Sequence, residues 1–203
     1  ESGEIITALE IPSGQTPATS EKLLANDTDP DGDTPTITAV NGETANVGTE
    51  IPLDGRDGEA LLTVNTDGSY IFDPNGAFES LAVGDSEDVT FTYTVSDEEG
   101  LTDEATVTLT VEGVNDAPTA ENDINTIDED SILTVDVANG VLANDTDPDD
   151  GDTLTISTVN GETANVGTEI PLDGRDGEAL LTVNTDGSYI FDPNGAFESL
   201  AVG

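Results

Sequence analysis

The residues best able to do chemistry in this chain are aspartates that recur at alternate positions in two short turns. The first turn reads DTDPDGD over residues 27–33, and the second reads DTDPDDGD over residues 145–152. Carboxylates spaced in this way beside a glycine can wrap around one cation, and Ca²⁺ takes about six to eight oxygen ligands in proteins. The pattern therefore predicts two calcium sites. Their expected ligands are Asp27, Asp29, Asp31 and Asp33 in the first turn and Asp145, Asp147, Asp149 and Asp152 in the second.

The same turns allow other interpretations. The spacing is similar to the start of an EF-hand loop, but the sequence lacks the glutamate at the twelfth position and the flanking helices. Magnesium is an alternative ion, although it retains water and takes fewer carboxylates. A solvated acidic loop without an ion is the other alternative. The Asp67-Gly68 pair and its copy Asp186-Gly187 are interpreted as plain hairpin turns and not as ligands.

A second group of acidic residues surrounds the join between the two halves of the chain. We expect carboxylates from the linker and from both neighbouring domains to share ions there, so that bound calcium converts a hinge into a stiff joint. These predicted ligands are Asp97, Glu99, Asp103, Asn115, Asp116, Glu121, Asp123, Asp128 and Asp130. The aspartate-rich turns are expected to act separately, as clips inside each domain.

Composition narrows the possible partners. The 203 residues include 45 acidic and 3 basic side chains, for a net charge of −42. A compact chain at this charge repels itself unless cations neutralise it. Nucleic acids and anionic lipids are excluded because only Lys22, Arg56 and Arg175 carry positive charge. The absence of cysteine and histidine excludes disulfides, thiolate metal sites and imidazole catalysis.

A long internal repeat sets the domain organisation. Residues 41–84 and 160–203 are identical over 44 positions, and residues 23–40 match 141–159 with one inserted aspartate. A repeat of this length indicates an array of whole domains. The expected domains are 1–115, with an atypical start, and 116–203, which stops before its last two strands. Because the chain begins at Glu1 without methionine, it is expected to be a fragment.

Alternating apolar residues predict strands. Val89–Val95 and Ala105–Val111 alternate with threonine, and Leu61–Phe72 reads as a hairpin that recurs at Leu180–Phe191. Further strands are expected at Thr34–Val40, Glu4–Ile11 and Ser131–Val137, and one helical turn within Asn75–Gly84. About seven short strands separated by turns indicate an all-β, immunoglobulin-like Greek-key β-sandwich. A small Greek-key barrel is the alternative.

The series VNDAP (114–118), DED (128–130), LANDTDPD (142–149) and NTDGSYIFDP (184–193) resembles the bacterial cadherin-like, VCBS-type repeat. Such repeats form arrays in RTX-type biofilm adhesins exported by type I secretion. The resemblance implies tandem cadherin-like domains that become rigid on binding Ca²⁺ outside the cell, with neighbouring repeats as partners. It also implies that Asn115, Asp116, Asp128 and Asp130 are junction ligands. The first repeat departs from the motif, because Glu10-Ile11-Pro12 replaces the DED sequence.

The sequence bears on three possible functions. The identical block and the low aromatic content of 4% favour a spacer, which gains length with each copy. An adhesive module for a sugar, a surface or a like copy is the alternative, but Tyr70, Phe72 and Phe78 are expected in the core. An enzyme is not expected, because paired carboxylates carry no information in a chain with so many acids.

Overall fold

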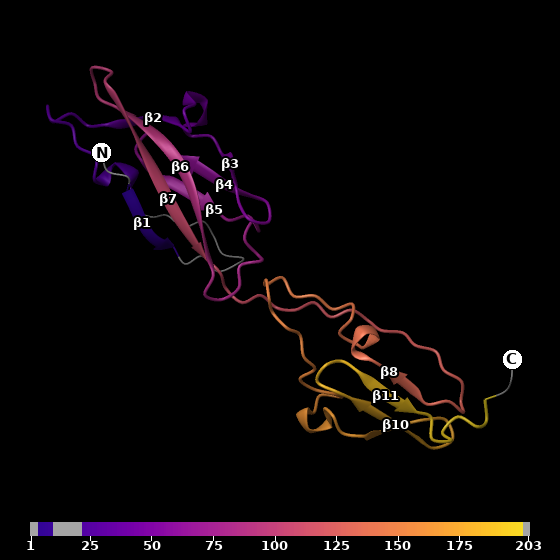
Figure 1. Ribbon diagram of the computed structural model, residues 1–203. Coiled ribbons are helices and arrows are strands. Elements are labelled where there is room, and N and C mark those ends of the chain that lie inside the picture. The colour runs from indigo at the N-terminus through magenta and orange to yellow at the C-terminus, as the bar shows by residue number, and fades with distance from the viewer. Residues whose placement is uncertain (1–3, 10–21, 201–203) are drawn as a thin grey trace. The chain divides into compact units, whose positions relative to one another are not determined.

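A computed structural model describes residues 4–9 and 22–200, and the side chains of 22–200 (Figure 1). Within these residues the regular elements are strands and single turns of 3-10 helix, which confirms the all-β prediction. No helix in this part of the chain is long and apolar enough to cross a membrane. Two compact units are present: Glu1–Asp116 with Asp149–Gly151, and Ala117–Pro148 with Asp152–Gly203.

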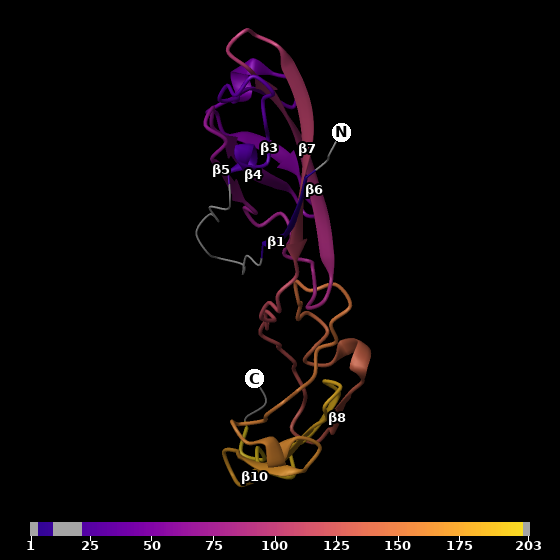
Figure 2. The ribbon, with the colours of Figure 1, turned by 90° about the vertical axis from the view of Figure 1, so that its left-hand side faces the viewer.

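The first unit is a β-sandwich of two sheets. Four strands in the order β1-β7-β6-β2 form one sheet, and three in the order β3-β4-β5 form the other. Figure 2 shows the two sheets as separate layers. Strand β1 runs parallel to β7, and the other pairs are antiparallel. The strands are β1 (Glu4–Leu9), β2 (Thr36–Val40), β3 (Ile51–Asp54), β4 (Glu59–Val64), β5 (Tyr70–Asp73), β6 (Ser86–Ser96) and β7 (Thr102–Glu112), with 3-10 turns η1 (Leu23–Ala25) and η2 (Thr44–Asn46).

The core lies between these sheets and follows the period-2 alternation of the long strands. Val, Phe and Tyr side chains of β6 and Val and Leu side chains of β7 are buried, while the intervening threonines are exposed or half-buried. Tyr70 of β5 packs against Phe91 of β6 with ring centroids 6.4 Å apart. Tyr70, Phe72 and Phe78 are all buried, as expected for core residues. The core therefore depends on both sheets being present.

Two turns of the first unit need a left-handed backbone. The hairpin between β4 and β5, predicted from the sequence, turns at Gly68 with a φ of +81°. At the end of β2, Asn41 and Gly42 have φ angles of 48° and 77°, and the Asn41 Oδ1 accepts a hydrogen bond from the Thr92 amide at 2.9 Å. Both positions carry residue types that tolerate this region. The helical turn expected within residues 75–84 is instead a run of hydrogen-bonded turns, such as that from the Ala77 amide to the Pro74 carbonyl.

The second unit contains one four-stranded sheet in the order β8-β11-β10-β9. Its β10–β11 hairpin repeats the register of β4–β5, since Val183 faces Tyr189 as Val64 faces Tyr70. Among the described residues of this unit there is no counterpart of β6 or β7. The elements are β8 (Leu133–Val135), β9 (Ile170–Asp173), β10 (Glu178–Val183), β11 (Tyr189–Asp192), η3 (Val137–Asn139) and η4 (Thr163–Asn165).

Candidate metal centre

The second aspartate-rich turn gathers three carboxylates. Asp147, Asp149 and Asp152 each place one oxygen within 4.8 Å of the others, and all three lie in one stretch of six residues. The Asp149 side chain is buried at 4% exposure, whereas Asp147 is half-buried and Asp152 exposed. Burying a carboxylate among other carboxylates is unfavourable unless a positive charge compensates for it. This turn therefore has the charge arrangement of a cation site.

The donor set fits calcium. Ca²⁺ binds carboxylate oxygens at about 2.3–2.6 Å, so ligands on opposite sides of one ion lie roughly 4.6–5.2 Å apart. Oxygens that all lie within 4.8 Å of one another are close to the separation that ligands of a single ion adopt. Asp147, Asp149 and Asp152 would hold the ion, and the ion would supply the charge that their mutual repulsion requires.

The linker hydrogen-bonds to the same turn. The Asp116 amide donates to Asp149 Oδ2 at 2.8 Å, and the Glu121 amide donates to Asp145 Oδ1 at 2.9 Å. Between them, Thr119 and Thr146 exchange backbone hydrogen bonds at 2.8 and 3.0 Å. The expectation that linker and turn lie apart is thus corrected, because linker amides bind turn carboxylates and Thr119 pairs with Thr146 over this stretch.

The aspartate inserted in the second turn has its own partners in the first unit. The Asp150 amide donates to the Ser80 carbonyl at 3.1 Å, and its carboxylate pairs with the guanidinium of Arg56. Arg56 also lies 3.9 Å from Glu87, and the hydrogen bond to Asp150 is the main cause that raises its pKa. Sequence reasoning missed Arg56 and Asp150. The available signals were the single-residue insertion and the scarcity of basic residues.

The first aspartate-rich turn is arranged differently. Asp29 Oδ1 accepts hydrogen bonds from the amides of Asp31, Gly32 and Asp33 at 2.8, 3.2 and 3.4 Å, so this carboxylate stabilises its own turn. The Asp27 carboxylate accepts from the buried Tyr93 hydroxyl at 3.1 Å. Within the described residues, no three of these four aspartates reach the spacing found in the second turn. The predicted first calcium site stays a prediction.

The turn between β6 and β7 lies far from the linker within the first unit. Asp97 caps this turn by accepting the Leu101 amide at 2.7 Å, and Glu99 and Asp103 are exposed beside it. The turn stands at the opposite end of β7 from residues 115–116. Ten residue steps of extended strand separate the two ends by about 33 Å. The structure therefore does not bring this turn near the linker of the same unit, and its predicted role at a junction between neighbouring domains stays a prediction.

The remaining predicted ligands lie in the segment after the linker. Asp128 Oδ1 accepts the Asp130 amide at 3.2 Å, and Asp123 is exposed. Between the two aspartates, Glu129 Oε2 is buried without a hydrogen-bond partner in the described part of the chain. Sequence reasoning passed over Glu129 in favour of its neighbours. The Asn115 side chain donates to the Asp116 carbonyl at 2.6 Å. Residues 10–12, which replace the DED sequence in the first repeat, lie outside the described part of the chain.

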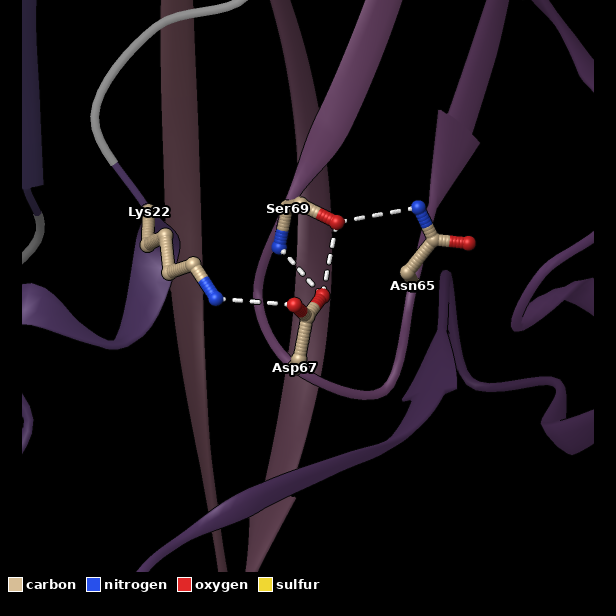
Figure 3. Close-up of polar contacts among 4 residues, drawn as sticks. All are labelled: Lys22, Asn65, Asp67 and Ser69. Atoms are coloured by element: carbon tan, nitrogen blue, oxygen red, sulfur yellow. Dashed lines mark hydrogen bonds and ion pairs between the residues drawn. The ribbon is translucent and has the colours of Figure 1, made fainter.

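The β4–β5 hairpin turn carries a polar network that uses its aspartate internally (Figure 3). Asp67 Oδ1 accepts the Ser69 amide and hydroxyl at 3.1 and 2.6 Å, Oδ2 pairs with Lys22 at 2.8 Å, and Asn65 donates to Ser69. The Lys22 hydrogen bond, and then the Ser69 bonds, hold the pKa of Asp67 well below its usual range. These contacts agree with the interpretation of this position as a turn.

Comparison with protein-family models gives a match over most of the chain. The model of the bacterial cadherin-like domain matches residues 6–113 and, in a second copy, residues 115–202. A search of curated proteins returned no match to the chain. The two matched ranges together cover nearly the whole sequence.

Proposed function

We propose a function from the premise that the chain belongs to the bacterial cadherin-like domain family, of which it carries two copies. Domains of this family occur in adhesin-like proteins, are of extracellular type, and are typically structural or adhesive and not enzymatic. They also generally bind calcium. The proposed function is a calcium-binding extender repeat of a large bacterial cell-surface adhesin, of the VCBS and RTX type found in biofilms. Its partners are neighbouring repeats of the same protein.

The observation that carries this proposal is the carboxylate cluster of Asp147, Asp149 and Asp152. An ion bound there would tie together three residues of one turn and compensate the buried charge of Asp149. Linker residues 116–121 are joined to the same turn by hydrogen bonds, two from linker amides to aspartate carboxylates and two between backbone groups. Ordering of the turn by calcium would therefore also order the linker, which is the physical basis for a stiffened joint.

Calcium titration of single variants tests this proposal. Asp149→Asn removes the buried negative charge, and we expect isothermal titration calorimetry to register the loss of at least one calcium equivalent. Asp173→Asn is the matched control, since it removes an exposed aspartate of the same chain outside the cluster. Calcium binding that is unchanged in Asp149→Asn, or equally reduced in both variants, would contradict the site.

A further inference from the structure

The first unit includes three residues that lie in the second repeat of the sequence. Residues Asp149–Gly151 group with Glu1–Asp116, whereas residues 117–148 belong to the other unit. The chain therefore leaves the first unit after Asp116 and returns to it at Asp149. At the point of return, Asp149 Oδ2 accepts a hydrogen bond from the Asp116 amide at 2.8 Å. Both ends of the excursion are thus held within the first unit.

The middle residue of the returning segment, Asp150, is attached at two points. Its amide donates to the Ser80 carbonyl at 3.1 Å, and its carboxylate accepts a hydrogen bond from the guanidinium of Arg56. One contact uses the main chain and the other uses the side chain of the same residue. The attachment therefore requires a carboxylate and an unused backbone amide at one position of the turn.

The first aspartate-rich turn does not offer this combination. It reads DTDPDGD, one aspartate shorter than the DTDPDDGD of the second turn. At the matching place, the amides of Asp31 and Gly32 both donate to Asp29 Oδ1, at 2.8 and 3.2 Å. These amides stabilise their own turn. The insertion of Asp150 therefore supplies one amide and one carboxylate beyond those that the shorter turn contains.

The surface that receives Asp150 has the same geometry where no aspartate is bound to it. Asp57 accepts the amide and the hydroxyl of Ser80, both at 2.8 Å. In the identical sequence of the second repeat, Asp176 accepts the Ser199 amide at 2.7 Å. Among the residues that the structure describes, the neighbouring Arg175 has no salt bridge. The surface is therefore preorganised, and binding an aspartate does not require it to rearrange.

We propose that Arg56 and the Ser80 carbonyl form a latch of the first unit, which binds an aspartate with an unused backbone amide and holds residues 149–151 in place. The latch closes without calcium, because the chain itself supplies the positive charge. Its selectivity comes from the pair of contacts. The guanidinium accepts any carboxylate, whereas the Ser80 carbonyl requires an amide at a fixed place beside it. Arg56 is thus a positioning residue for the segment that contains Asp149, whether or not an ion binds there.

Amide exchange measured by NMR on the full chain in excess chelator tests the latch. Arg56→Gln and Asp150→Asn each remove the ion pair and keep the backbone intact. We expect the protection factors of the amides at positions 116 and 150 to fall by about two- to fivefold. This is the size expected for an exposed ion pair, and the two side chains are 40% and 59% exposed. Protection factors are used because they correct for the intrinsic exchange rate of each sequence.

The double variant and a matched arginine provide the controls. Arg56→Gln combined with Asp150→Asn should lose no more protection than either change alone, because both remove the same contact. Arg175→Gln removes the copy of the arginine from an identical stretch of sequence and should leave both amides unchanged. Unchanged protection in the single variants, additive losses in the double variant, or an equal loss in Arg175→Gln overturns the proposal. An equal loss across Val89–Val95 of β6 also overturns it, since that loss reports general destabilisation.

Salt separates ion pairing from packing. At about 1 M NaCl, where the Debye length is about 3 Å, the protection of the unsubstituted chain should approach that of Arg56→Gln. A difference that persists undiminished at this salt concentration overturns the ion pair as the closing contact. Because every measurement is made in chelator, failure of the calcium site would leave this result unaffected, and failure of the latch would leave the calcium titration unaffected.

Discussion

At the scale of single residues, two aspartates in identical turns have different partners. Asp67 pairs with Lys22 and Ser69. Asp186 accepts its hydrogen bonds, among the residues that the structure describes, from Ser188, and glycine at position 140 occupies the place of the lysine. Hydrogen bonds from serine lower the pKa of both carboxyl groups, and the lysine lowers that of Asp67 further. The repeat therefore contains an internal comparison of one carboxylate with and without a cation.

Substitution of Lys22 by glutamine is expected to raise the pKa of Asp67 towards that of Asp186. NMR titration of the two carboxyl carbons measures the change, and Asp186 is the control that should not move. When folding lowers the pKa of an aspartate, the charged carboxylate stabilises the folded state at pH values above the ordinary aspartate pKa of about 3.9. This contribution is lost as the pH falls from that value through the folded-state pKa. The variant should lose part of that contribution, with little change in acid stability at the lowest pH. An unaltered Asp67 titration would contradict the assigned role of Lys22.

The residue spacing predicts where the candidate metal site lies but not how its side chains are arranged. The DTDPD spacing lies in the turn in which Asp147, Asp149 and Asp152 meet, and the calcium site predicted from it stays a prediction. Nothing in the spacing revealed that the second copy gathers its carboxylates while the first uses Asp29 to bind its own backbone. Side-chain direction within a turn depends on local backbone angles and on contacts distant in sequence, which a spacing pattern does not contain.

At the scale of elements, strand formation depends on a partner as well as on local pattern. Residues 36–40 form β2 against β6, whereas the similar residues 155–159 form no strand in the described part of the second unit. The hairpins at β4–β5 and β10–β11 form in both units, because each strand finds its partner within a few residues. Local pairing could therefore be predicted from the sequence, and pairing across the sandwich could not.

Two glycine substitutions separate backbone strain from crowding in these turns. Gly42→Ala should destabilise the first unit by about 1–2 kcal/mol, because the left-handed backbone at this position disfavours a residue with a Cβ atom. A Cβ at position 42 would have no heavy atom within 4 Å, so crowding adds nothing to this cost. Gly68→Ala should cost more. Its Cβ would lie 2.8 Å from Leu24 Cγ and 3.1 Å from the Leu24 amide nitrogen. Urea unfolding measures both free energies, and equal losses would contradict the crowding at Gly68.

At the scale of the whole molecule, charge dominates. The net charge of −42 is spread over two small units with few basic residues. Self-repulsion of this kind weakens the folded state. Cations that bind only the folded chain oppose it by mass action.

Calcium is expected to raise the melting temperature beyond the effect of ionic strength. Millimolar calcium against a Kd of ~10 μM would stabilise the folded state by about 2.7 kcal/mol per site. Calorimetry in calcium, in excess chelator and in NaCl of matched ionic strength separates site binding from screening. A melting temperature in chelator with NaCl equal to that in calcium would contradict calcium binding.

Extension of the chain is also expected to respond to calcium. If ion binding orders the linker, small-angle X-ray scattering should give a narrower distribution of interatomic distances in calcium than in chelator. Asp149→Asn should scatter in calcium as the unsubstituted chain does in chelator, while Asp173→Asn should respond normally. Identical profiles of the unsubstituted chain in both conditions would remove the support for an extender function.

The bond between Asn41 and β6 has a consequence for chemical ageing. Asparagine followed by glycine loses ammonia when the glycine amide attacks the side-chain carbonyl, and a succinimide and then isoaspartate result. The Thr92 amide holds the side-chain oxygen of Asn41, whereas Asn160 has no such bond within the described residues of its unit. Asn160-Gly161 should therefore age first during storage at mildly alkaline pH. Peptide mass spectrometry distinguishes the two sites through their different preceding residues.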